Sequence, residues 1–94
     1  MMPTLTFLGA LRRAAGRASV VVDAENVGAA LTALGPTLGQ SAVGLLVREG
    51  ALQPDVEVLV NGRNIAFLQG LDTPLEAADH VTVFISGLRG FPGG

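Results

Sequence analysis

The sequence predicts one small α+β domain in which a sheet packs against a helix, and three features of the chain predict it. Segments of alternating or β-branched residues lie towards both ends of the chain, and a segment with apolar residues at helical spacing lies between them. The chain has 94 residues, 49% of them hydrophobic and 15% charged, so it can form one core and is not a disordered protein.

Two strands are expected at the start of the chain. Thr4–Leu8 begins by alternating polar and apolar residues, which is a strand pattern. Ala18–Ala24 contains three consecutive valines, and β-branched residues favour strands. The short basic segment Gly9–Gly16 is interpreted as the connection between them, which completes a β-hairpin.

One main helix is expected after this hairpin. Asn26 can cap its first turn through the side-chain oxygen. An apolar stripe follows at helical spacing: Val27, Ala30, Leu31 and Leu34. Gly35-Pro36 is predicted to end the helix, because glycine suits a helix C-terminus and proline cannot continue it. Thr37–Arg48 is compatible with either a short second helix or an ordered loop.

The second half of the chain predicts further strands. Val56–Val60 alternates in strand fashion, and Asn61-Gly62 then favours a tight turn because both residues tolerate positive φ. Ile65–Leu68 is expected to begin the return, and Gly70–Asp79 is rich in turn residues. Val81–Ile85 is predicted as the last strand, adjacent to the first strand at the centre of a mixed sheet of four to five strands.

The predicted domain covers residues 1–86, and residues 87–94 form a flexible tail in this interpretation, since four of these eight residues are glycine. The expected core consists of large apolar residues from the strands and the helix stripe: Leu5, Phe7, Val20, Val22, Val27, Leu31, Leu34, Val58, Val60, Val81 and Val83.

Charge and composition exclude several classes of function. The formal net charge is −2, and the six basic residues are scattered arginines, so we expect no nucleic-acid partner. No apolar run approaches the ~18 residues of a membrane span, and no basic segment precedes the first apolar one as in a signal peptide. We therefore expect a cytoplasmic protein without a membrane partner. The chain has no cysteine and therefore no disulfide. It also has no lysine, so it cannot accept an isopeptide bond on a side chain.

The usual components of an active site are few, which predicts a protein that is not itself an enzyme and holds no metal or cofactor. His80 is the only histidine and is interpreted as a strand-edge residue. Asp72, Glu76 and Asp79 match no calcium loop and are interpreted as a solvated acidic turn. Three arginines are interpreted as part of a solvated surface turn, which is favoured over a partner-binding patch: Arg12, Arg13 and Arg17.

The remaining candidate site is the C-terminal segment. Gly93 and Gly94 have no Cβ, so a narrow channel of a partner protein can hold this backbone closely. A fully extended segment from Gly87 to Gly94 reaches up to ~28 Å, so a carboxylate at Gly94 can enter a partner's buried site while the domain docks outside. Phe91 and Pro92 lie just before it and are candidate partner contacts.

Four segments in this order resemble the ubiquitin-like sulfur carriers of the β-grasp fold, of the MoaD and ThiS type and above all the small subunit of molybdopterin synthase. The segments are Val58–Ile65, Phe67–Leu75, Asp79–Phe84 and the Gly93-Gly94 pair. The middle segments are fairly specific in combination, whereas the N-terminal half matches only in pattern.

The resemblance implies a carrier function for the C-terminus. In that family an E1-like enzyme adenylates the terminal glycine, which is then converted to a thiocarboxylate. By position, Gly94 would carry the sulfur and Gly93 would lie in the partner's channel. The implied partners are the E1-like adenylating enzyme and the large catalytic subunit of molybdopterin synthase.

The tail departs from the family pattern and leaves other functions open. It is about four residues longer than the family's usual tail, which adds roughly 13 Å of reach, and it contains Arg89 and Phe91. The identity of the sulfur acceptor is therefore left open, and the sulfur could instead go to a thiolated tRNA base, thiamine or an amino acid. A protein modifier joined to target lysines through Gly94 and a plain interaction domain are the remaining hypotheses.

Overall fold

A mixed five-stranded sheet forms the centre of the protein, as the sequence predicts. The computed structural model describes residues 2–85. The spatial order of the strands is β2-β1-β7-β5-β6. Their bounds are β1 Thr4–Phe7, β2 Ser19–Val21, β5 Val56–Val60, β6 Arg63–Asn64 and β7 His80–Ile85.

The first and last strands pair in parallel at the middle of this sheet, as expected. Leu5 lies opposite Val81 and Phe7 opposite Val83. On its other side, β7 pairs antiparallel with β5, so Val83 also faces Val58. Strand β7 is thus paired on both edges as far as Val83, and Phe84 and Ile85 continue paired with β5 alone.

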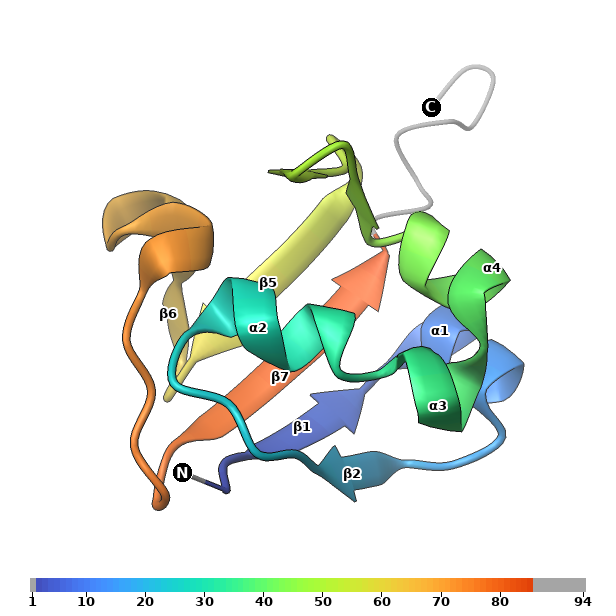
Figure 1. The fold of residues 1–94 in the computed structure, drawn as a ribbon, viewed down its shortest axis with the longest axis horizontal. Helices are drawn as coiled ribbons and strands as arrows, with labels where there is room; N and C mark the ends of the chain where they lie inside the picture. The colour runs from blue at the N-terminus through green and yellow to red at the C-terminus, as the bar shows by residue number, and fades with distance from the viewer. Residues whose placement is uncertain (1, 86–94) are drawn as a thin grey trace.

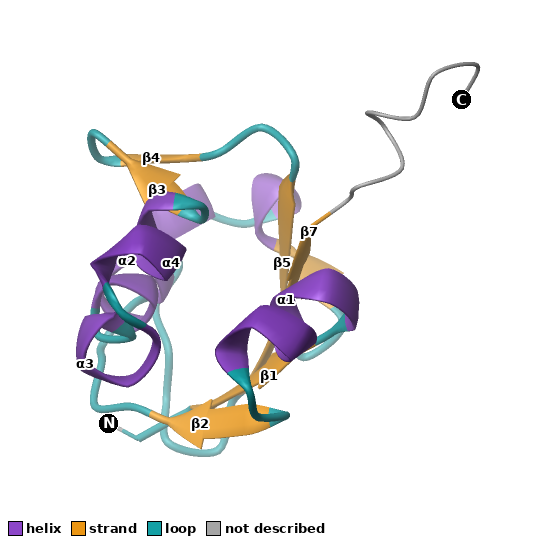
Figure 2. Ribbon diagram, turned by 90° about the vertical axis from the view of Figure 1, so that its right-hand side faces the viewer, coloured by secondary structure: helices purple, strands orange, loops and turns teal. Residues whose placement is uncertain are grey.

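Helices cover one face of the sheet, as Figures 1 and 2 show from two directions. The predicted main helix is α2, Val27–Thr32, and the Asn26 side chain caps it by accepting the Ala29 N–H at 2.7 Å. Two short helices follow it, α3 Gly35–Leu38 and α4 Gln40–Gly44. The expected short helix within 37–48 is thus α4.

Gly35-Pro36 does not end the main helix, contrary to the prediction. Helix α2 already ends at Thr32, and Pro36 lies in the first turn of α3. Proline is tolerated there because the first N–H groups of a helix have no intrahelical partner. The pair therefore starts a helix here.

The connection between the first two strands is a helix, which the sequence analysis did not predict. Helix α1, Gly9–Ala15, consists after its glycine of Ala, Leu and Arg, all strong helix formers, and ends at Gly16 with φ 75°. Leu11 is 1% exposed and belongs to the core. The basic segment thus contributes to the fold and is more than a link.

A second, two-stranded sheet was also missed. It consists of β3 (Val47–Arg48) and β4 (Ala51–Leu52), joined by Glu49-Gly50 with φ of 53° and 78°. The predicted return at 65–68 is likewise a 3₁₀ turn, η1 (Ile65–Phe67), followed by a second one, η2 (Gly70–Asp72). The sheet itself continues only through the two residues of β6.

The core lies between the large sheet and the helices. Ten of the eleven expected core residues are buried, and Val20 is half-buried against them on the edge strand β2. Buried side chains that were not among the expected core residues include Leu11, Val43, Leu46, Ile65 and Leu75.

Candidate functional site

The end of strand β7 leads into the segment that the sequence marks as the candidate site. Gly94, Gly93, Pro92 and Phe91 lie outside the described residues, as does the predicted domain boundary at 86/87. The described chain reaches Ile85, which pairs with Val56 at one end of the sheet. The candidate segment therefore continues from the central strand of the fold.

The sheet face opposite the helices carries partly apolar side chains close to this end. On β7, Val81 and Val83 are buried towards the helices, whereas Thr82 and Phe84 alternate with them and are half-buried. Leu59 of β5 lies opposite Thr82, and Glu57 lies opposite Phe84. A partner bound against Phe84 would thus be next to the residues that follow Ile85.

A hydrogen-bonded network fixes the opposite end of β7. The Asn61 side chain donates to Asp79 Oδ1 at 2.9 Å and accepts the His80 N–H at 2.9 Å. The Asn61 N–H donates to the His80 carbonyl at 2.8 Å. The carboxylate of Asp79 also accepts the Glu76 N–H at 2.8 Å. These bonds hold the Asn61-Gly62 turn against the start of β7.

The hydrogen bonds of this network stabilise the ionised form of Asp79. The Glu76 N–H, and then the Asn61 amide, lower the pKa of the Asp79 carboxyl below its ordinary value, against a small opposing effect of desolvation. The His80 ring is hydrogen-bonded to Thr6, with 2.7 Å between His80 Nε2 and Thr6 Oγ1. Each of these polar groups thus has a structural partner.

Within residues 2–85, no three His, Asp or Glu side chains are grouped so that they could hold a metal ion. In the same range, no helix is long and apolar enough to cross a membrane. Arg12, Arg13 and Arg17 are exposed, but Arg12 and Arg13 lie on helix α1 and not in the turn that the sequence analysis expected.

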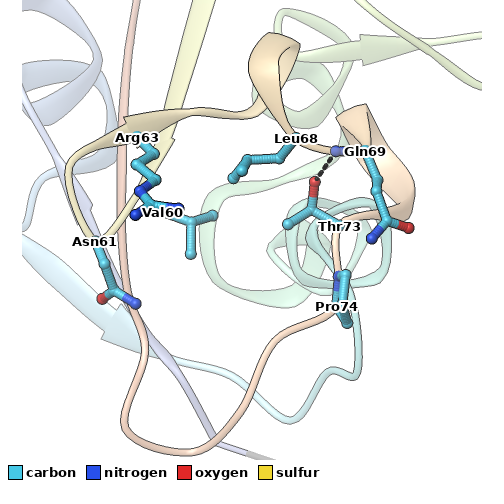
Figure 3. A pocket seen from close by; sticks show the side chains of 7 residues that line it. All are labelled: Val60, Asn61, Arg63, Leu68, Gln69, Thr73 and Pro74. Atoms are coloured by element: carbon cyan, nitrogen blue, oxygen red, sulfur yellow. Dashed lines mark hydrogen bonds between the residues drawn. The ribbon is translucent and has the colours of Figure 1, made fainter.

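A groove lies beside the Asn61-Gly62 turn, and the sequence analysis gave it no role (Figure 3). Its volume is about 590 Å³. It lies between the β5–β6 hairpin and the segment that contains the 3₁₀ turns. Its lining residues are Val60, Asn61, Arg63, Leu68, Gln69, Thr73 and Pro74. No pattern in the sequence pointed to it.

Comparison with known proteins assigns the chain to a family. The model of the ThiS family matches residues 5–85. The chain is 36% identical to small archaeal modifier protein 3 of Haloferax volcanii over 85% of this chain and 89% of the relative. It is 33% identical to a predicted sulfur carrier protein of Archaeoglobus fulgidus over 66% of this chain and 73% of the relative.

Solved structures confirm the predicted β-grasp fold. Small archaeal modifier protein 1 of Methanosarcina acetivorans superposes with a TM-score of 0.80 at 24% identity, over 90% of this chain and 94% of that one. A predicted molybdopterin converting factor subunit 1 of Pyrococcus furiosus gives 0.71 at 20% identity, over 90% and 97%. At these identities the likeness shows the fold alone. With the family model matching nearly all of the described residues, the chain belongs to the ThiS family of ubiquitin-like proteins.

Proposed function

We propose that this protein is a sulfur carrier whose C-terminal Gly94 is adenylated by an E1-like enzyme and converted to a thiocarboxylate. The ThiS family match over residues 5–85, in a chain that has a Gly93-Gly94 pair after its central strand β7, carries this proposal. Adenylation turns the carboxylate into an acyl donor, and a sulfur nucleophile then displaces AMP. The protein needs no cysteine for this step, because the sulfur is carried at the main-chain terminus.

The proposal assigns separate roles to the domain and the tail. Residues 1–86 dock on the activating enzyme, and the half-buried Phe84 and Leu59 offer an apolar contact beside the end of β7. Residues 87–94 reach into the partner's active site, with Gly93 in the narrowest part and Pro92 and Phe91 against its walls. The partner enzymes supply the catalytic groups and bind the nucleotide. We place the sulfur transfer in the cytoplasm.

The adenylation step can be tested directly with purified proteins. The chain is mixed with the E1-like enzyme of its own organism and ATP, and exchange between pyrophosphate and ATP is measured. We expect exchange with the intact chain and its loss when Gly94 is deleted. Arg48→Gln, a change on strand β3, is the matched control and should leave exchange unchanged. Exchange that persists without Gly94 would contradict the proposal.

Molybdopterin synthesis is the sulfur-consuming pathway that we propose first. The segments from Val58 to Phe84 support it, because they resemble the small subunit of molybdopterin synthase. A stable complex with the cognate large subunit, in which the tail is protected from proteolysis, is the expected result. If purified proteins form no such complex, the sulfur goes to a different acceptor, such as a tRNA base, thiamine or an amino acid.

Protein modification is the second candidate function, and the 36% identity to small archaeal modifier protein 3 favours it. In this role Gly94 would form an isopeptide bond with lysines of target proteins. Because the chain has no lysine, a second copy could not be attached to a side chain of the first, so targets would carry single copies. Immunoblots of native cells should then show conjugates that disappear when Gly94 is deleted.

A further inference from the structure

We propose that the groove beside the Asn61-Gly62 turn, here named the Arg63 groove, binds an acidic segment of a partner protein. Its seven lining residues are those labelled in Figure 3. This inference concerns a surface separate from the C-terminal segment. It does not depend on the proposed sulfur transfer.

The charge of the groove selects an anionic ligand. Among the described residues, Arg63 is the only charged one that lines the groove, and none of them contributes a carboxylate. Within residues 2–85, the Arg63 guanidinium makes no hydrogen bond or ion pair, and its side chain is exposed. An unpaired guanidinium presents several N–H donors in a geometry that matches a carboxylate.

Two of the other polar side chains of the groove, those of Asn61 and Thr73, already have partners. The Asn61 amide is bonded to Asp79 and to the His80 N–H. The Thr73 hydroxyl accepts the Gln69 N–H at 3.0 Å and donates to the Gly70 carbonyl at 2.7 Å. These bonds keep the walls in place, so the groove exists before a ligand arrives and little ordering is needed on binding.

The apolar lining selects a peptide over a free carboxylate ion. Val60 is 7% exposed, Leu68 packs partly against the core, and Pro74 forms the opposite side. Figure 3 shows Leu68 and Arg63 extending towards Val60 from two sides of this space. A ligand that fills it therefore combines an aliphatic side chain with a neighbouring carboxylate, as Leu or Val beside Glu or Asp does.

The residue before Leu68 offers one further contact for a protein partner. Phe67 directly precedes Leu68 and is 88% exposed, the most exposed of the large hydrophobic side chains in the described chain. Exposed aromatic residues frequently anchor protein interfaces. A segment lying in the groove would place the rest of its protein within reach of Phe67.

The groove lies away from the end at which β7 leads to the candidate segment. Val60 pairs with Val81 near the start of β7, whereas Ile85 ends this strand. Four residue steps at ~3.3 Å separate Val81 from Ile85, about 13 Å along the strand. A partner bound in the Arg63 groove thus leaves the Ile85 end free for a second protein.

Peptide titration of the isotope-labelled full chain, followed by NMR, tests the groove. The probe is the capped tetrapeptide acetyl-Leu-Glu-Val-Glu-amide, and the matched peptide carries Gln in place of both Glu residues. We expect saturable shifts of the backbone amides of Val60, Arg63, Leu68, Gln69 and Thr73 with the acidic peptide. The neutral peptide should bind at least about tenfold more weakly.

Two arginine variants make the test specific. Arg63→Gln should weaken binding by at least about tenfold, whereas Arg48→Gln, on β3 outside the groove, should leave it unchanged. The spectrum of each variant, recorded without peptide, shows whether that variant is folded. The proposal is wrong if the acidic peptide causes no saturable shifts, shifts residues elsewhere, or responds equally to both variants.

Discussion

At the scale of residues, Asn61 combines two properties that few side chains share. Its backbone has φ 52°, in the left-handed region, and its side chain bonds both to Asp79 and to His80. Asparagine tolerates this conformation better than other non-glycine residues and carries both a donor and an acceptor. The residue therefore sets the turn and connects it to the central strand.

Two substitutions at this position separate these properties. Asn61→Gly keeps the backbone conformation and loses the side-chain hydrogen bonds, whereas Asn61→Ala also strains the backbone. We expect Asn61→Ala to lower the free energy of unfolding by about 1–2 kcal/mol more than Asn61→Gly. Urea unfolding measures both, and equal losses would contradict a role for the left-handed conformation.

The lowered pKa of Asp79 predicts a pH dependence of stability. Because its pKa is lower in the folded than in the unfolded chain, the stabilisation is complete above the unfolded pKa and is lost as the pH falls through the folded pKa. Asp79→Asn removes this ionisation. In urea unfolding between pH 7 and pH 3, the variant should lose less stability than the parent chain. A parallel decline of both proteins would show that Asp79 does not contribute.

At the scale of elements, Leu46 is one of the buried side chains that attach the segment after α2 to the core. Leu46 is fully buried, whereas its neighbour Leu45 is 53% exposed. The pair lies between α4 and β3, where helix spacing gives way to the short hairpin. Packing of Leu46 therefore fixes both elements on the core.

These neighbouring leucines provide a matched test of that packing. Leu46→Ala should lower the free energy of unfolding by about 2–5 kcal/mol, because it leaves a cavity in the core. Leu45→Ala should change it by no more than about 0.5 kcal/mol. Thermal or urea unfolding distinguishes the two, and a similar small effect for both would place Leu46 outside the core.

The elements also show how far local sequence patterns can predict this fold. Strands β1, β2, β5 and β7 and the helix cap were predicted because alternation, β-branching and the Asn-Gly turn act locally. Helix α1 was missed because its single large buried side chain, Leu11, gives too little periodicity in seven residues. The hairpin β3–β4 has only two residues in each strand, so no alternation could develop.

The candidate site was predictable to a different degree. The glycine pair stands out in the sequence, and the resemblance to a family gave it a role. The Arg63 groove could not be predicted, because η1 and η2 bring Leu68 and Thr73 near the β5–β6 hairpin through tertiary packing. A lone arginine after a turn gives no sequence signal by itself.

At the scale of the whole molecule, the parallel pairing of β1 with β7 joins the two halves of the chain. Val83 faces Phe7 on one side and Val58 on the other and is fully buried. Strand β2, by contrast, forms an edge of the sheet, and Val21 on it is 54% exposed. Stability should therefore be concentrated at the centre of the sheet.

The same substitution at these two valines tests that distribution. Val83→Ala should lower the free energy of unfolding by about 2 kcal/mol, because it removes buried apolar surface at the junction of three strands. Val21→Ala should cost no more than about 0.5 kcal/mol. Chemical denaturation checks both, and comparable losses would contradict a stability centred on β7.

In the sequence, the Gly93-Gly94 pair follows the central strand of the sheet, and the sulfur-carrier proposal depends on the chemistry of Gly94. The intact mass of the chain isolated from its native cells tests this chemistry most directly. The account predicts a fraction of the protein in which one oxygen is replaced by sulfur, and the loss of this fraction when Gly94 is deleted. A carboxylate as the only form, in cells actively making sulfur-containing cofactors, would contradict the carrier function.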